Sequence, residues 1–150
     1  QMKDAVMERA DAFDFIVKAA AVGDYRPVSR SSEKIKRQGK DQMTVAFEQN
    51  PDIAALVGAV KRPGQILVGF AAESHDLEKN ALEKIKRKNL DFVVANKITG
   101  KNGAFESDHN TIQILDPGGA RLIFSGTKEE AAWAVWDFAT VAGSSFAQGS

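Results

Sequence analysis

Short runs of bulky apolar residues alternate along the chain with amphipathic segments. The apolar runs are typical of strands buried on both faces, and they cover residues 13–20, 65–70 and 91–95. The amphipathic segments predict helices over residues 2–12 and from 74 or 76 to 88. A helix-start sequence predicts another helix from 50 to about 61. This alternation favours an α/β fold, a three-layer Rossmann-like domain whose mostly parallel sheet carries helices on both faces.

The last third of the chain has a different pattern. Residues 111–115 and 121–124 flank an Asp-Pro-Gly-Gly sequence, which predicts a β-hairpin. Thr127 and Glu130 have the spacing of a capping box, so a final helix is expected to begin there and to end near Thr140. We therefore expect residues 1–142 to belong to a single domain and residues 143–150 to form a flexible tail.

A long polar stretch separates the first two apolar runs. Residues 21–32 predict a loop, and residues 43–48 alternate as a short strand does. The charged residues 34–40 between them have no core pattern, so we expect a mobile flap. The following sequence has the residue types of a helix start, with an N-cap, a proline at the first helical position and an acid, at Asn50, Pro51 and Asp52.

Composition narrows the classes of function. Twenty basic and twenty acidic residues cancel, so we expect neither a broadly basic surface nor nucleic acid as a partner. The chain has no cysteine, which removes thiolate metal sites and thiol nucleophiles and favours a reducing, cytoplasmic location. His75 and His109 are too far apart in sequence for a His-rich metal motif. No apolar run approaches the roughly 20 residues that span a membrane.

Candidate binding residues follow the predicted strands, where open α/β sheets bind their ligands. The small residues Ala20 and Ala21 let a ligand approach the backbone, and Asp24 offers an acceptor for an amino group. Lys84 and Lys88 share one helix face. Each pattern taken alone is equally typical of a solvated turn, a charge run or a helix C-terminus.

In this order and at these spacings, the stretches resemble the bacterial phosphopantothenate–cysteine ligase family. The matching sequences are AAVGDYRP (20–27), EKIKR (33–37), QNPDI (49–53), GFAAE (69–73), KIKRKNLDFVVAN (84–96) and FESDHN (105–110). Gly23 stands where the family often has alanine, a small-for-small change. The resemblance implies that the domain lacks its N-terminal strand or strands, and that an asparagine linked to the reaction intermediate and an FMN-binding decarboxylase half would precede Gln1.

The resemblance implies a CTP-dependent ligase that joins 4′-phosphopantothenate to L-cysteine in coenzyme A biosynthesis. The carboxylate would attack the α-phosphate of CTP to form an acyl-cytidylate and pyrophosphate. The cysteine amine would then displace CMP. Magnesium would accompany the triphosphate. A homodimer is also implied, and no membrane partner is expected.

The resemblance also implies roles for individual residues. Lys34 matches a catalytic flap lysine that would bind CTP and stabilise charge on the reacting phosphates. Asp24 would accept a hydrogen bond from the cytosine amino group. The other CTP-binding positions would be Ala20, Ala21, Pro51, Asp52, Ile53, Ala54, Phe70, Lys84 and Lys88. No metal ligand is assigned.

Three alternatives stay open. The chain would be a nucleotide-binding fragment, inactive by itself, if a phosphate-binding strand upstream is required. A Rossmann-type oxidoreductase domain is the second, although neither G-x-G-x-x-G nor G-x-x-x-x-G-K-[ST] occurs in the sequence. The third is the ATP-using eukaryotic type of ligase. The KIKR, NPDI and RKNLD sequences favour the bacterial type instead.

Overall fold

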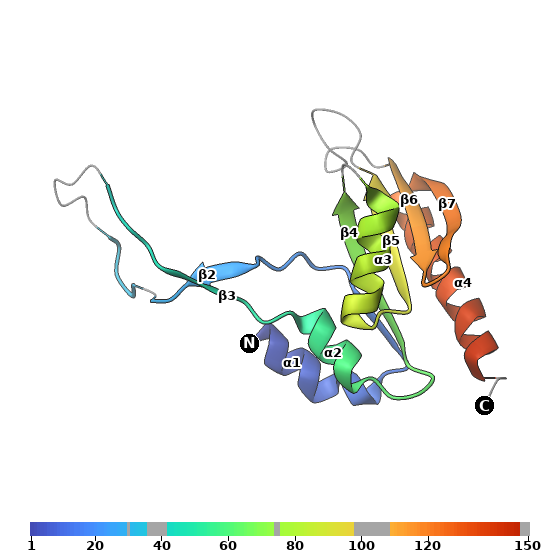
Figure 1. Cartoon of the computed structure of the whole chain (residues 1–150), viewed down its shortest axis with the longest axis horizontal. Coiled ribbons are helices and arrows are strands. Elements are labelled where there is room, and N and C mark those ends of the chain that lie inside the picture. Colours follow the sequence, from blue (N-terminus) through green and yellow to red (C-terminus); the bar gives the residue numbers. More distant parts are fainter. Residues whose placement is uncertain (30, 36–41, 74–75, 98–108, 148–150) are drawn as a thin grey trace. The chain divides into compact units, whose positions relative to one another are not determined.

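The computed structural model describes residues 1–29, 31–35, 42–73, 76–97 and 109–147 (Figure 1). The chain divides into two compact units. We call residues 1–20 with 53–150 the sheet unit, and residues 21–52 the ribbon unit. The single domain that the sequence predicts over residues 1–142 stays a prediction, since two compact units can belong to one domain. The division has a simple physical reason, because none of the described side chains of the ribbon unit is buried.

A mixed sheet of five strands, in the order β1-β4-β5-β6-β7, forms the centre of the sheet unit. The parallel strands are β1 (Phe15–Lys18), β4 (Ile66–Glu73) and β5 (Phe92–Lys97). The antiparallel hairpin consists of β6 (His109–Asp116) and β7 (Gly119–Thr127). The predicted buried strands and the hairpin are confirmed.

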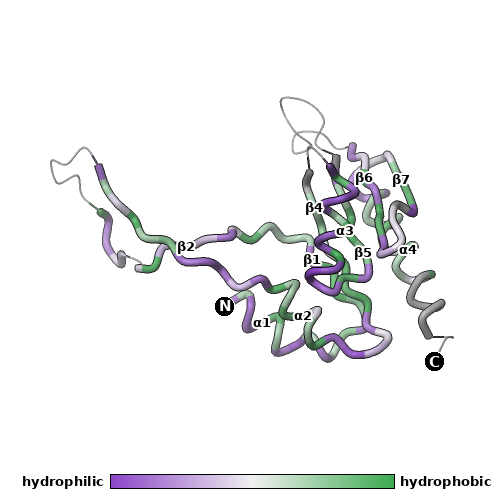
Figure 2. Tube along the Cα trace, viewed as in Figure 1, coloured by the Kyte–Doolittle hydropathy of each residue, from purple (hydrophilic) through white to green (hydrophobic). Residues whose placement is uncertain are grey.

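Helices cover both faces of this sheet, which confirms the three-layer Rossmann-like fold (Figure 1). The chain begins with α1 (Met2–Arg9) and the short 3-10 helix η1 (Ala10–Ala12). Figure 1 shows α3 (Leu77–Lys88) in front of the sheet and α4 (Lys128–Ala147) behind it. The fully apolar α2 (Ile53–Val60) packs beside α3, which is mostly polar (Figure 2).

Alternation along the strands divides the core into two layers. The layer under α4 contains Ala131, Val135 and Ala139 of the helix, and it is completed by sheet residues Ile66, Val68, Phe92, Val94, Ile112 and Ile114. Leu67 and Val93 lie between these positions and therefore face α3. Each buried Val, Leu, Ile or Phe side chain of these layers contributes roughly 1.5–3 kcal/mol, so the sheet unit has a substantial core of its own.

Two helix boundaries differ from the prediction. The last helix, α4, continues to Ala147 and includes residues 143–147, which the sequence assigned to a tail, because a single glycine costs a helix only about 0.5–1 kcal/mol. The second helix, α2, begins at Ile53 instead of at the predicted N-cap Asn50. The side chain of Asn50 is used elsewhere, since its Nδ2 donates a 2.7 Å hydrogen bond to the carbonyl of Gly23.

The ribbon unit contains a two-stranded antiparallel sheet of β2 (Tyr25–Pro27) and β3 (Phe47–Gln49). The predicted strand at 43–48 is thus present in shorter, shifted form, whereas β2 lies where a loop was predicted. Arg26 joins the two strands, with Nε 2.9 Å from Oε1 of Glu48. Tyr25 and Phe47 are 65% and 59% exposed, so this sheet has no apolar core of its own.

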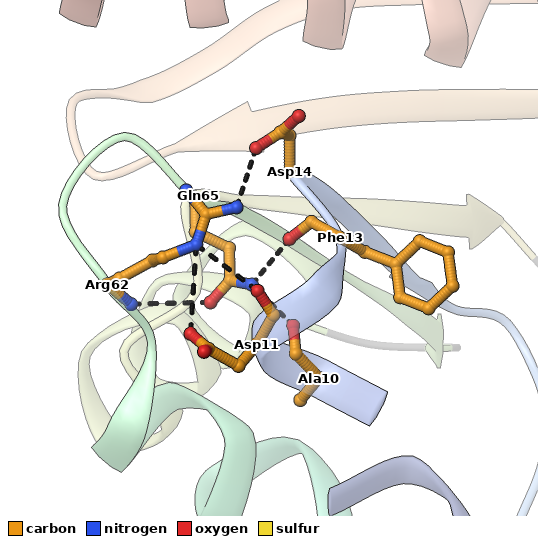
Figure 3. Close-up of polar contacts among 6 residues, drawn as sticks. All are labelled: Ala10, Asp11, Phe13, Asp14, Arg62 and Gln65. Atoms are coloured by element: carbon orange, nitrogen blue, oxygen red, sulfur yellow. Dashed lines mark hydrogen bonds and ion pairs between the residues drawn. The ribbon is translucent and has the colours of Figure 1, made fainter. Parts of the chain in front are cut away.

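A buried glutamine attaches the N-terminal helices to the sheet (Figure 3). Gln65 is 4% exposed, and its Nε2 donates hydrogen bonds of 2.7 Å to the carbonyl of Ala10 and 2.6 Å to that of Phe13. Its Oε1 accepts from the backbone N–H of Arg62, whose side chain pairs with Asp14 at 2.7 Å. Both ends of the Gln65 amide are therefore satisfied inside the protein.

Within the described ranges, none of the helices has the length and apolar character that a bilayer-spanning helix requires.

Candidate functional site

The carboxyl ends of the parallel strands lie at one edge of the sheet, where ligands bind in open α/β folds. Six predicted site residues belong to the sheet unit: Ala20, Ile53, Ala54, Phe70, Lys84 and Lys88. The other five belong to the ribbon unit: Ala21, Asp24, Lys34, Pro51 and Asp52. Lys36, Arg37, His75 and residues 98–108 lie outside the described residues.

Phe70 presents an accessible aromatic ring near the carboxyl end of β4. It follows Ile66 and Val68 at the strand period of two, so its side chain lies on the α4 face of the sheet. The two preceding residues of this series are buried, whereas Phe70 is 41% exposed. An aromatic face at this edge is suited to contact a planar or apolar part of a ligand.

Ile53 and Ala54 open α2, and their side chains are buried in the core of the sheet unit. Their side chains are therefore part of the packing, and only their backbone groups are suited to contact a ligand. The first N–H groups of a helix have no acceptor in the helix's own preceding turn, and the helix dipole is positive at this end. The predicted contribution of these two residues to nucleotide binding is thus a backbone contribution.

Lys84 and Lys88 lie in the second half of α3. Their side chains are half-buried, whereas Lys86 and Arg87 of the same helix are exposed. The end of α3 lies directly against α2, because a Cβ atom at Gly58 would overlap the carbonyl oxygen of Lys88. Lys84 also lines a surface hollow on α3, which two further cations, Lys86 and Arg87, share with the carboxylate of Glu83 and with Asn80.

A capped turn holds the end of α3 in this position. Asn89 follows the helix in the left-handed conformation, with φ of 51°, and its Nδ2 donates a 2.7 Å hydrogen bond to the carbonyl of Gly58. The Asn89 amide and the missing side chain of Gly58 together permit the close approach of the two helices. This approach brings α2 against the part of α3 that carries Lys88.

In the ribbon unit, the side chain of Asp24 is exposed. Its backbone is held by a hydrogen-bond network that could not be predicted from the sequence. The carbonyl of Asp24 accepts a 2.7 Å hydrogen bond from the N–H of Asn50. The Oδ1 of Asn50 accepts a 3.0 Å hydrogen bond from Arg26. The sequence predicts a helix cap at Asn50, but its amide and backbone N–H instead bind the carbonyls of Gly23 and Asp24. The network fixes the backbone around Asp24 while its carboxylate faces solvent.

Lys34 is exposed and follows a side-chain turn in the ribbon unit. The hydroxyl of Ser31 donates a 2.7 Å hydrogen bond to the carbonyl of Glu33 and accepts one from its N–H. None of the described residues 31–35 is buried. A substitution of Lys34 is therefore not expected to disturb packing.

The described residues contain no group of three or more His, Cys, Asp or Glu side chains arranged to hold a metal ion. Magnesium in nucleotide sites takes several ligands from phosphates and water. A magnesium ion carried by a nucleotide therefore does not require such a group from the protein.

Comparison with known proteins gives one family. Residues 1–141 match the family described as the DNA/pantothenate metabolism flavoprotein C-terminal domain. Over 130 residues the chain is 38% identical to the coenzyme A biosynthesis bifunctional protein CoaBC of Vibrio parahaemolyticus, which covers 86% of this chain and 33% of that protein. Over 116 residues it is 41% identical to a cysteine/cysteine sulfinic acid decarboxylase of an unknown prokaryotic organism, covering 77% and 32%.

The fold has a close counterpart among solved structures. The crystal structure of the C-terminal domain of a CoaBC protein superposes with a TM-score of 0.69 at 27% identity, covering 94% of this chain and 62% of that chain. The chain thus spans about a third of the length of the curated relatives it matches, at 33% and 32%.

Proposed function

Since the chain belongs to the DNA/pantothenate metabolism flavoprotein C-terminal domain family, we propose that it acts in coenzyme A biosynthesis as a CTP-dependent ligase that joins 4′-phosphopantothenate to L-cysteine. The family match over residues 1–141 is the observation that carries this proposal. The similarity to CoaBC of Vibrio parahaemolyticus, at 38% identity, supports the pathway.

The proposed reaction has two steps. The carboxylate oxygen attacks the α-phosphorus of CTP, so that an acyl–phosphate bond forms and the α–β phosphoanhydride bond breaks, releasing pyrophosphate. The cysteine amine then attacks the acyl carbon, loses a proton to solvent and expels CMP. Negative charge builds on oxygen atoms in both steps, and fixed cations and N–H donors stabilise such charge.

The chain offers groups of this kind. Lys84 and Lys88 supply cations on α3, and the first turn of α2 supplies N–H donors. Phe70 offers its exposed ring to the nucleotide. In the ribbon unit, Asp24 would accept from the cytosine amino group, and Lys34 would neutralise charge on the reacting phosphates. Magnesium would arrive with CTP as part of the substrate.

The proposal includes a homodimer. Isolated two-stranded sheets are marginally stable in water, and the β2–β3 sheet exposes both Tyr25 and Phe47. A second copy of the chain would cover these side chains. Sedimentation equilibrium measures the mass directly, and Tyr25→Ser with Phe47→Ser should shift a dimer towards monomer. A wild-type chain that is monomeric at micromolar concentration would overturn this part of the proposal.

The main test combines binding with turnover. We expect CTP to raise the melting temperature, and ATP and NAD to do so much less. We also expect pyrophosphate release that requires both CTP and phosphopantothenate. Stabilisation by CTP without pyrophosphate release would identify a nucleotide-binding fragment. Stabilisation by NAD alone would support an oxidoreductase domain instead.

A further inference from the structure

Asn50 binds two consecutive carbonyl groups of the ribbon unit. Its backbone N–H donates a 2.7 Å hydrogen bond to the carbonyl of Asp24, and its Nδ2 donates one of 2.7 Å to the carbonyl of Gly23. The first bond continues the β2–β3 ladder, in which Tyr25 pairs with Gln49. The second is a side-chain bond that the ladder alone does not supply. The two bonds hold the two peptide groups that flank the Cα atom of Asp24.

Holding both peptide groups sets the direction of the Asp24 side chain. Peptide groups are planar, so the orientation of the two groups beside a Cα atom determines its φ and ψ. The direction of the Cα–Cβ bond follows from them, which leaves only the side-chain rotamer to vary. Asp24 is exposed, and so are its chain neighbours Gly23 and Tyr25. Hydrogen bonds to the backbone, more than packing, therefore aim this carboxylate.

Arg26 decides which way the Asn50 amide points. Its Nη1 donates a 3.0 Å hydrogen bond to Oδ1 of Asn50, and its Nε donates one of 2.9 Å to Oε1 of Glu48. An amide accepts only at its oxygen and donates only at its nitrogen. With the oxygen toward Arg26, the nitrogen is directed to the carbonyl of Gly23. Arg26 and Asn50 are half-buried, whereas the remaining residues of β2 and β3 are exposed.

The residue before Asp24 has no side chain to restrict its backbone. Glycine has the widest conformational freedom of all residues. The φ of Gly23 lies outside the left-handed region, and a Cβ atom there would be 3.7 Å from its nearest neighbour, the carbonyl oxygen of Tyr25, which is an ordinary contact. The conformation thus does not require a glycine. The orientation of the Gly23 carbonyl depends on the Asn50 amide instead of on local sterics.

We propose that Asn50, oriented by Arg26, is a positioning residue for base specificity, because it holds the backbone of Asp24 so that the carboxylate meets the amino group of cytosine. This role rests on the proposed function, in which Asp24 accepts a hydrogen bond from that amino group. Uracil has a carbonyl oxygen at the same place. A carboxylate held there attracts cytosine and repels uracil, whereas a carboxylate that can turn away does neither.

The first arm of the test compares CTP and UTP by calorimetry on the full chain. The wild type should bind CTP about ten- to a hundredfold more tightly than UTP, because UTP leaves the carboxylate unpaired. Asn50→Ala should reduce this ratio about tenfold, an ordinary coupling between residues in contact. Its melting temperature should change by less than about 2 °C, since no described side chain of the ribbon unit is buried. Gln49→Ala, which removes the neighbouring exposed amide, is the matched control and should keep the ratio.

The second arm asks whether Asn50 acts through Asp24. Asp24→Asn should itself reduce the CTP/UTP ratio, and adding Asn50→Ala should then change the ratio no further. Adding Gly23→Ala to Asn50→Ala should restore the ratio about two- to fivefold, because alanine restricts the backbone that the amide no longer holds. Arg26→Gln should shift the ratio in the same direction as Asn50→Ala. It also provides a second variant if Asn50→Ala does not fold.

The outcomes separate the positioning role from the proposed function. An unchanged CTP/UTP ratio in Asn50→Ala overturns the role. Equal losses of affinity for both nucleotides also overturn it, since they would show that Asn50 supports only the adjoining Pro51 and Asp52. A further loss of selectivity in the Asp24→Asn background has the same meaning. A wild-type chain that binds neither nucleotide overturns the proposed function, and one that binds both equally overturns base recognition by Asp24.

Discussion

The sheet unit and the ribbon unit carry similar numbers of predicted site residues but differ in what holds them. In the sheet unit, Phe70, Lys84 and Lys88 project from elements whose other faces are buried. In the ribbon unit, Asp24 and Lys34 project from a segment without a buried side chain among its described residues. Burial therefore positions one set, and hydrogen bonds such as those of Asn50 position the other. Changes to the ribbon should then alter function without altering stability.

The largest difference between an effect on activity and an effect on stability is expected at Lys34. In a ligase-active protein, Lys34→Gln should lower kcat by on the order of 10²-fold or more, because a cation acting on transition-state charge affects kcat more than KM. The melting temperature should stay within about 2 °C, as for an exposed substitution. Steady-state pyrophosphate release measures the first and thermal unfolding the second. Lys36→Gln is the neighbouring control and should keep most of its turnover. If Lys34→Gln has the same kcat as this control, Lys34 has no specific role in catalysis and is an ordinary solvated charge.

The next largest effect is expected at the two half-buried lysines of α3. Lys84→Gln and Lys88→Gln should each weaken CTP binding about tenfold, which corresponds to about 1.4 kcal/mol. Their melting temperatures should change little, since single surface charges contribute a few tenths of a kcal/mol. The exposed Lys86→Gln on the same helix is the matched control. Calorimetry that gives all three variants one CTP affinity would remove Lys84 and Lys88 from the site.

The sheet unit should show the opposite behaviour at Gln65. Gln65→Leu leaves the carbonyls of Ala10 and Phe13 without their donor, which should cost about 1–3 kcal/mol of unfolding free energy. CTP affinity should remain that of the wild type, because Gln65 precedes β4 at the edge opposite the candidate site. Gln49→Leu in the ribbon unit is exposed and should change stability by less than about 0.5 kcal/mol. Urea unfolding of the two variants compares the units directly, and equal losses of unfolding free energy would show that burial does not distinguish the two units.

The smallest effect is a pH dependence at the start of α4. Oε2 of Glu130 accepts hydrogen bonds from the N–H and the hydroxyl of Thr127, at 2.8 Å and 2.9 Å, and these bonds together with the nearby His109 lower the pKa of Glu130. A lowered pKa in the folded state contributes stability above the ordinary glutamate range, and this contribution is lost as pH falls through the folded-state value.

Acid should therefore destabilise the wild type more than Glu130→Gln, which keeps the capping geometry without the titrating group. Urea unfolding at about pH 7 and about pH 3 measures the difference for each protein. Identical pH dependence in the two proteins would show that the cap does not titrate between these values.

Local patterns allowed much of the sheet unit to be predicted. The hairpin turn at 116–119 and the capping box at Thr127 depend on residues close together in sequence, and the structure confirms both. Chemistry that depends on distant partners was not predictable in this way. Nothing next to Gln65 in the sequence indicates that its amide binds Ala10 and Phe13, more than 50 positions away.

The same distinction between local patterns and distant contacts applies to the candidate site. Family resemblance indicated Lys34, Phe70 and Lys84 because these positions lie in short, recognisable motifs. It did not distinguish the exposed ring of Phe70 from the buried side chains of Ile53 and Ala54, since exposure depends on what packs against each residue.

The amino-acid sequence by itself determined the order of strands and helices in the sheet unit, the hairpin and the family, because hydrophobic periodicity, turn residues and motif spacing are local properties of the chain. Tertiary structure alone decided the separate ribbon unit and the use of Asn50 to hold the backbone of Asp24. Register and burial arise from contacts between residues that are far apart in sequence, so each polar side chain acquires its role only when the sheet assembles around it.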